Sequence, residues 1–474
     1  MNRIPEQGIE RSKVLEMLRS FNSDDANYHD SKTWSLVYYL SEDHTNFLKE
    51  AYGMYFSENA LNPMAFKSLK RMESEIVRMS AGLLGGDDNT VGVMTSGGTE
   101  SCLLPVVTYR ELAKSKRRLP FRPEMIAPRS IHVAWSKAAK YFGVKIHYVP
   151  LCADNRVDVN AVRKLINRNT IMIVCSAPSY PHGVIDPVTE LGRLAIEHDL
   201  PLHVDSCVGG FLLPFIEKNG FNVDPFDFRV PGVTSISADI HKYGFSAKGA
   251  SVLLYKNMNY LKHQFFVKTD WPGGVFASPA MLGTRPGGAI AAAWAAMNVF
   301  GVSGYKEIAA AIMGTTEKLK KGIEEIPGLK VLGKPAMSVF AYTSTDRAVD
   351  IFAVGDQLEA KGWLVDRLQN PDALHCMVIP RHAMIADDYL KDIREAVETV
   401  RSNPGLAVKG NAAMYGMIAN VPFKGLIQNE VMKMMENLYG PECKMPSFEA
   451  DPSGSKLLDR AMPIVLKILR RFKK

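Results

Sequence analysis

The sequence has 474 residues, of which 46% are hydrophobic and 23% are charged, the balance of an ordinary soluble globular protein. This length predicts two or three domains. The net charge of +7 is not gathered into a basic block, so the composition does not predict a nucleic-acid-binding protein.

Short β-branched runs alternate with helical stretches through the middle of the chain. Residues 1–75 predict an N-terminal segment of helices and loops, residues 76–320 a large domain, and residues 321–474 a smaller C-terminal α+β domain. The alternation predicts an α/β fold whose mostly parallel sheet is covered by helices and binds its ligand at the carboxyl ends of the strands. The predicted strands are 90–96, 130–135, 145–151, 170–176, 201–206, 234–239 and 250–255, and the helices between them are 100–115, 156–168 and 187–199.

The cysteines and the apolar stretches indicate a cellular compartment. The six cysteines include no CxxC pair and predict reduced thiols rather than disulfides or a zinc site. Residues 1–21 contain no apolar signal core, and the apolar stretch 289–302 is shorter than the roughly 20 residues that a membrane span needs. We therefore expect a soluble, cytoplasmic protein, with export by a signal-independent route left open.

The first candidate site is the stretch "MTSGGTESCLL" (94–104), which predicts a strand, a glycine turn and a helix. Glycines allow close approach of the backbone, and the first amides of a helix can bind a phosphate. The stretch matches neither the dinucleotide pattern G-x-G-x-x-G nor a Walker P-loop. Taken alone, an ordinary capped helix start is the favoured interpretation.

The second candidate is Asp205, at the end of the strand in "PLHVDSCVGGF" (201–211). A carboxylate there needs a cationic or hydrogen-bonding partner, and a protonated pyridine nitrogen would serve. His203 and Asp205 could instead be metal ligands. No third ligand follows at a familiar spacing, so we predict no metal.

The third candidate is Lys242 in "SISADIHKYGFSAKG" (235–249). A lysine in an apolar surround loses its proton more readily, and the neutral amine attacks aldehydes to give a Schiff base. The alternative is a solvated lysine that closes a loop.

A phosphate cradle, an aspartate and a lysine in this order predict pyridoxal 5′-phosphate as the cofactor. Lys242 would hold its aldehyde, Asp205 would keep its ring nitrogen protonated, and the glycine turn would anchor its phosphate. His132 is placed to stack on the ring; without the other features it would be read as a buried histidine with satisfied hydrogen bonds.

The sequence resembles the sphingosine-1-phosphate lyase family in four motifs: "TSGGTES" (95–101), "HVDSCVGGF" (203–211), "SADIHKYGFSAKG" (237–249) and "GTRPGG" (283–288). This family is a branch of the pyridoxal-phosphate decarboxylases within the fold type I, aspartate-aminotransferase-like superfamily. The resemblance implies that Lys242 forms the Schiff base, Asp205 pairs with the ring nitrogen, and His132 stacks on the ring. Around the cofactor phosphate it places Gly98, Thr99 and His241.

The resemblance also implies a homodimer with a shared active site. Gly283 and Thr284 would complete the phosphate site of the neighbouring subunit. Tyr38 and Lys248 match residues that hold the substrate phosphate in related lyases. Asn62 stands where the family usually has a histidine; it can donate a hydrogen bond to a phosphate but cannot carry a charge or shuttle a proton. In a second departure, Ile240 replaces a common threonine.

The implied activity is that of a lyase that cleaves sphingosine or sphinganine 1-phosphate to phosphoethanolamine and a long-chain fatty aldehyde. One alternative is an amino-acid decarboxylase with the same cofactor, and another is a lipid-binding relative without activity. The tail 463–474 mixes apolar residues with five basic ones, which raises the hypothesis of weak peripheral membrane contact. A terminal helix docked on its own protein is the favoured alternative.

Overall fold

The computed structural model describes residues 3–116, 122–420 and 424–443, and the chain divides into two compact units. The larger unit comprises Trp34–Tyr342 and His375–Leu390, and the smaller comprises Met1–Thr33, Thr343–Leu374 and Lys391–Lys474. Every site residue predicted from the sequence belongs to the larger unit. The three-part division at about residues 75 and 320 stays a prediction.

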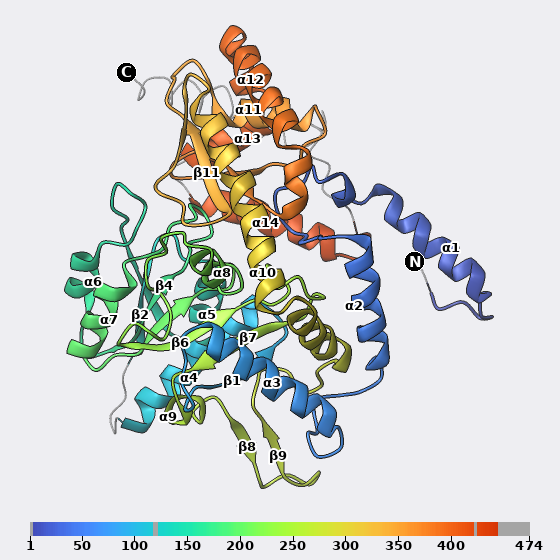
Figure 1. Cartoon of the computed structure of the whole chain (residues 1–474), viewed down its shortest axis with the longest axis vertical. Coiled ribbons are helices and arrows are strands. Elements are labelled where there is room, and N and C mark those ends of the chain that lie inside the picture. Colours follow the sequence, from blue (N-terminus) through green and yellow to red (C-terminus); the bar gives the residue numbers. More distant parts are fainter. Residues whose placement is uncertain (1–2, 117–121, 421–423, 444–474) are drawn as a thin grey trace. The chain divides into compact units, whose positions relative to one another are not determined.

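A seven-stranded sheet of order β1-β7-β6-β5-β4-β2-β3 forms the centre of the larger unit (Figure 1). Only β7 runs antiparallel to its neighbours β1 and β6, while the other described pairs are parallel. The predicted mostly parallel α/β sheet is therefore confirmed. The strands are β1 (Val91–Thr95), β2 (Glu124–Pro128), β3 (Lys145–Val149), β4 (Thr170–Ser176), β5 (Leu202–Asp205), β6 (Val233–Ala238) and β7 (Ser251–Tyr255).

Helices pack against this sheet and enclose the core. Helix α4 contacts β4, β6 and β7, and α7 contacts β4 and β5. Trp135 and Tyr109, both fully buried, belong to a core of apolar side chains shared by the strands and by α4 and α5. The helices are α2 (Glu42–Met54), α3 (Lys67–Leu83), α4 (Gly98–Lys116), α5 (Ala134–Phe142), α6 (Val159–Leu165), α7 (Val188–Glu197), α8 (Leu213–Lys218), α9 (Met258–Leu261) and α10 (Gly287–Glu324).

The predicted strand at 130–135 is wrong. The strand in this part of the chain is β2, which ends at Pro128, and the backbone amide of Ile131 donates to the Pro128 carbonyl in a turn. The amide of Trp135 then donates to the His132 carbonyl as α5 begins. The β-branched residues that suggested a strand thus form a turn, and His132 lies in it.

Helix α10 is longer than the apolar stretch read from the sequence. It has 38 residues with a non-helical Gly301 (φ 55°) inside it, and it packs on α2, α3 and α8. Among the described residues it is the one helix long and apolar enough to cross a membrane by length and composition, and half of its apolar window is buried within the protein. That burial is typical of the core helix of a globular unit.

The remaining elements of the larger unit are a two-stranded ribbon, β8 (Phe266–Lys268) with β9 (Phe276–Ser278), and the strands β10 (Leu329–Val331) and β11 (Val339–Ser344), the last residues of which pass into the smaller unit. Turn η3 (Pro380–Met384) lies in the larger unit, and strand β13 (Ala373–Met377) and helix α12 (Ala386–Ser402) are divided between the two units. The smaller unit contains α1 (Arg11–Phe21), η1 (Asn22–Asp24), η2 (Tyr28–Asp30), α11 (Ile351–Glu359), β12 (Asp366–Leu368), η4 (Pro404–Val408), α13 (Gly410–Asn420) and α14 (Lys424–Tyr439).

The loop after β4 depends on a glycine. Gly183 has φ +68°, and a Cβ atom on it would lie 1.8 Å from the carbonyl oxygen of Val339. We expect Gly183→Ala to destabilise the protein by more than the roughly 1–2 kcal/mol of the left-handed backbone alone, as a lowered thermal melting temperature. Gly314→Ala, in α10 with no atom within 4 Å of the added Cβ, should not lower that temperature, because alanine favours helix. Equal melting temperatures for the two variants would contradict this account.

Candidate active site

A cavity of about 240 Å³ opens at the carboxyl ends of the strands. Its wall includes Ser176 at the end of β4, Asp205 at the end of β5, and Asp239 directly after β6. Parallel strands place such residues at one edge of a sheet, which is why residues far apart in sequence meet here. Six predicted site residues line the cavity: Gly98, Thr99, His132, Asp205, His241 and Lys242.

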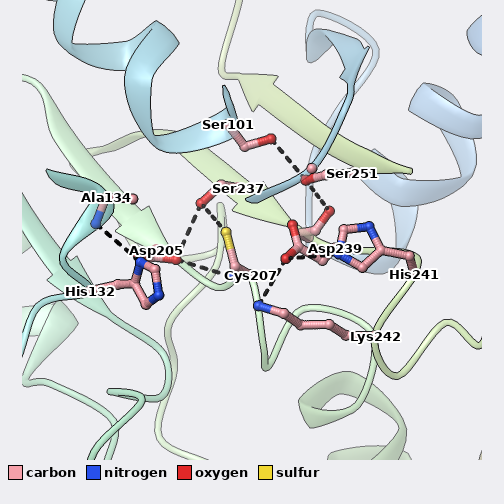
Figure 2. A network of polar contacts seen from close by, with 12 residues as sticks. Ser101, His132, Ala134, Asp205, Cys207, Ser237, Asp239, His241, Lys242 and Ser251 are labelled. Carbon is pink, nitrogen blue, oxygen red and sulfur yellow. Dashed lines mark hydrogen bonds and ion pairs between the residues drawn. The ribbon is translucent and has the colours of Figure 1, made fainter. Parts of the chain in front are cut away.

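Asp205 is buried and held by several donors (Figure 2). The indole Nε1 of Trp135 donates to its Oδ2 at 2.8 Å, and the amide of Cys207 donates to Oδ1 at 3.2 Å. Burial opposes ionisation, but His132 and the hydrogen bond from Trp135 outweigh it and lower the pKa of Asp205. A fixed, ionised carboxylate suits a cationic ring nitrogen.

Lys242 follows β6 and meets a carboxylate that the sequence interpretation did not assign. Its Nζ lies 2.9 Å from Oδ2 of Asp239, whose side chain is 1% exposed (Figure 2). Burial lowers the pKa of Lys242, but Asp239 outweighs burial and raises it well above the ordinary value. The expectation of an apolar surround that releases the lysine proton is therefore wrong. The alternative of a solvated lysine closing a loop is wrong as well, because Lys242 lines the cavity.

The predicted phosphate end of the cavity is built from the start of α4. Gly98 begins this helix and Thr99 follows it, so their amides belong to the first turn, where four backbone donors lack helical partners. His241 lies beside them, and the amide of Ala250 donates to its Nδ1 at 3.3 Å. Glu100 caps the helix by accepting from the amide of Ser96 at 2.7 Å. The stretch is thus both a capped helix start and a wall of the cavity.

His132 stands at the opposite wall. It is exposed rather than buried, and its Nδ1 accepts from the amide of Ala134 at 3.2 Å. Its ring centroid lies 6.1 Å from that of Tyr180, a further lining residue. The alternative of a buried histidine is wrong, because the side chain of His132 is exposed.

Tyr38 and Lys248 form a pair of their own. The Nζ of Lys248 lies 5.2 Å from the centroid of the Tyr38 ring and donates to the carbonyl of Leu36 at 3.0 Å. Neither is among the residues that line the cavity. Burial, followed by Tyr243, raises the pKa of Tyr38, and Lys242 opposes this rise. Burial, followed by Lys242, lowers the pKa of Lys248.

Asn62, Gly283 and Thr284 do not line the cavity; all three are exposed. The Oδ1 of Asn62 accepts from the amide of Met64 at 3.0 Å. The hydroxyl of Thr284 accepts from Nδ2 of Asn59 at 3.2 Å. The structure therefore brings the Asn62 loop and the Gly283–Thr284 loop together, outside the cavity of their own chain.

Sequence reasoning did not assign the supporting residue Trp135 or several lining residues: Cys102, Ser176, Pro178, Tyr180, Cys207, Val208 and Asp239. Trp135 lies one helical turn after His132, and Asp239 precedes Lys242 by three positions, so both spacings were available as signals. The two cysteine sulfurs and an oxygen of Asp205 lie within 4.8 Å of one another, the one such cluster of potential metal ligands among the described residues. Nothing in the sequence spacing pointed to this cluster.

The residues fit pyridoxal 5′-phosphate. Asp205 offers an acceptor for a protonated ring nitrogen, Lys242 an amine for the aldehyde, and α4 free amides for the phosphate. Oδ1 of Asp239 is buried with no hydrogen-bond partner among the described residues, while Oδ2 pairs with the Lys242 amine at 2.9 Å. The fold and the site define an enzyme of the pyridoxal-phosphate-dependent fold type I class.

Comparisons with known proteins agree with this class. The pyridoxal-dependent decarboxylase conserved domain matches residues 54–343. The chain is 44% identical to sphingosine-1-phosphate lyase of Oryza sativa subsp. japonica, covering 91% of this chain and 81% of that protein. It is 43% identical to sphingosine-1-phosphate lyase 1 of Rattus norvegicus, covering 93% and 77%. The solved sphingosine-1-phosphate lyase of Burkholderia pseudomallei has a TM-score of 0.82 at 39% identity, covering 92% and 97%. The chain belongs to the pyridoxal-dependent decarboxylase family and, within it, to the sphingosine-1-phosphate lyases.

The hydrogen bond from Trp135 to Asp205 can be tested by substitution. Trp135→Phe removes the donor while keeping an aromatic side chain, and hydrogen bonds to charged groups contribute about 1.5–3 kcal/mol. We expect the affinity for pyridoxal 5′-phosphate, measured by equilibrium dialysis and absorbance, to fall by about tenfold or more. Trp294→Phe is the matched control, since that indole donates to Glu75 at 2.6 Å on the helical surface. Unchanged cofactor affinity in Trp135→Phe would refute the assignment.

Proposed function

We propose that this protein cleaves the C2–C3 bond of sphingosine or sphinganine 1-phosphate, giving phosphoethanolamine and a long-chain aldehyde. The observation that carries the proposal is the cavity holding Lys242 and Asp205 in a chain that is 39–44% identical to sphingosine-1-phosphate lyases over most of its length. The fold alone would not distinguish this activity: glutamate decarboxylase of Lactobacillus brevis matches with a TM-score of 0.74 at 22% identity.

When bound, pyridoxal 5′-phosphate supplies an aldehyde for an amine and a ring that accepts electrons from a breaking bond. Lys242 supplies the amine that holds this cofactor between turnovers. Asp205 keeps a proton on the ring nitrogen, because an ionised carboxylate in a buried site favours a neighbouring cation. The exposed ring of His132 would stack on the cofactor ring, and the first turn of α4 with His241 would bind the phosphate.

Lys248 and Tyr38 are proposed to hold the substrate phosphate. The ammonium of Lys248 lies over the Tyr38 ring, so a phosphate would meet a cation and a hydroxyl together. Binding of a group remote from the reacting bond orients the substrate so that the C2–C3 bond is the one that breaks. During cleavage the C3 hydroxyl loses a proton and C2 gains one.

A second subunit is proposed to complete the site. Gly283 and Thr284 are exposed and lie beside Asn62, together with the exposed apolar side chains of Leu61 and Leu282. Exposed apolar residues around a polar loop are typical of an interaction surface. We propose that these two loops face the cavity of a second copy of the chain, as a shared site of a homodimer.

We propose a cytoplasmic location. The basic tail 463–474, on which weak peripheral membrane contact depends, lies outside the described residues. That contact stays a hypothesis.

Product identification tests the activity. The cofactor-loaded protein with sphinganine 1-phosphate should release phosphoethanolamine and a fatty aldehyde, detected by mass spectrometry. Lys242→Ala should abolish both products and the visible cofactor absorbance, because the amine that binds the aldehyde is gone. Release of carbon dioxide from amino acids, without aldehyde from the lipid, would establish the decarboxylase alternative instead. Absorbance without either reaction would favour a binding protein.

A complementation experiment tests the shared site. Gly283→Trp should fill the partner's cavity, and Lys242→Ala should empty its own, so each variant alone should be inactive. Co-expression with two affinity tags yields hybrid dimers in which one site has an intact Lys242 from one chain and an intact Gly283 from the other. Partial activity should return in the purified hybrids. Hybrids that are isolated intact but inactive would contradict the shared arrangement.

A further inference from the structure

The carboxylate of Asp239 is fixed against the amine of Lys242. The backbone amide of Asp239 donates to the Cys207 carbonyl at 3.1 Å, and the amide of Lys242 donates to the Asp239 carbonyl at 3.3 Å. Oδ2 of Asp239 lies 2.9 Å from Nζ of Lys242 and 3.7 Å from Nε2 of His241.

The opposite side of this carboxylate is closed by α4. A Cβ atom on Gly98 would lie 2.6 Å from Oδ2 of Asp239. Only a residue without a side chain leaves room for the carboxylate there. The absence of a Cβ at Gly98 therefore allows Asp239 to face the lysine. Gly98 has this role in addition to allowing a phosphate to approach the backbone.

The other groups around Lys242 do not provide a competing anion. Burial raises the pKa of Tyr38, and the hydrogen bond with Cys102 together with burial raises that of Cys207, so both stay neutral near neutral pH. Burial lowers the pKa of His241, so its imidazole stays neutral there. Burial and, after it, the charge of Lys242 lower the pKa of Lys248. Asp239 is the largest of the groups that raise the pKa of Lys242; Tyr38 and Cys207 follow it and add to this effect only where they ionise.

We propose that Asp239 is a positioning residue that holds the free side chain of Lys242 as an ammonium ion inside the cavity. Whenever the amine is not bonded to the cofactor, it carries a proton and stays at the edge of the sheet. A protonated Nζ can donate a proton but cannot accept one. With the reaction proposed above, on which this step rests, Lys242 is suited to add the proton at C2 and unsuited to remove the proton from the C3 hydroxyl.

Competitive labelling measures this protonation without any substrate. The full-length protein is freed of cofactor with hydroxylamine and treated with limiting acetic anhydride over a series of pH values. The acetyl group transfers to a neutral lysine Nζ, acetate leaves, and the amine proton passes to the buffer. Mass spectrometry quantifies acetylation at Lys242 and, as an internal reference, at the exposed Lys145. The midpoint for Lys242 should lie above that for Lys145.

Asp239→Asn removes the charge and keeps the shape. The midpoint for Lys242 should fall by about 1–3 pH units, the range of an adjacent opposite charge, with about tenfold more labelling per unit below the midpoint. Asp224→Asn removes an exposed carboxylate paired with Arg156 and should leave the midpoint unchanged. A parent midpoint at or below that of Lys145, which needs no variant to fold, overturns the proposal. So does an unchanged midpoint in folded Asp239→Asn. If the parent protein shows the expected labelling midpoint for Lys242 but has no lyase activity, the proposed function is wrong and the proposal for Asp239 is unaffected.

Discussion

The site depends on burying a carboxylate at the end of a parallel strand without losing its charge. Asp205 lies at the end of β5, where the burial that makes a strong partner for a cation also penalises the carboxylate itself. The donors that relieve this penalty come from α5, from the chain after β5 and from β6. Each donor lies on a different segment of the chain. The packing of the sheet with its helices is therefore needed to keep this one side chain ionised.

The two sides of the cavity solve opposite electrostatic problems. At Asp205 an anion is stabilised by the nearby His132 and by hydrogen-bond donors, and its charge is available for a cofactor. At Lys242 a cation is stabilised by a full opposite charge, which neutralises the pair while the amine is free. The first arrangement favours a cationic ring. The second keeps the Lys242 amine protonated, and so unreactive as a nucleophile, until it bonds to the aldehyde.

Much of this site could be predicted because its residues follow strands with strong hydrophobic patterns. Asp205 and Lys242 stand next to β5 and β6, whose fully buried runs are legible in the sequence, and the parallel topology then brings them to one edge. His132 was placed correctly at the cavity although its strand was wrong, because a turn after β2 reaches the same edge. Asp239 was not assigned although it precedes Lys242 by only three positions, and the sequence does not show that Gly98, 141 positions earlier, makes room for its carboxylate. The pKa of Lys242 was misjudged for the same reason.

The side chain of Asn59 joins two exposed loops. Its Oδ1 accepts from the amides of Leu61 and Arg285, and its Nδ2 donates to Thr284. Arg285 is in turn anchored by a buried ion pair with Glu73 at 2.7 Å. Because these hydrogen bonds join the two loops, a displacement of one loop should displace the other. Asn62, assigned to the substrate phosphate, and the Gly283–Thr284 pair, assigned to the cofactor phosphate of the second subunit, would then be displaced together, so a mutation that repositions one proposed contact should also disturb the other.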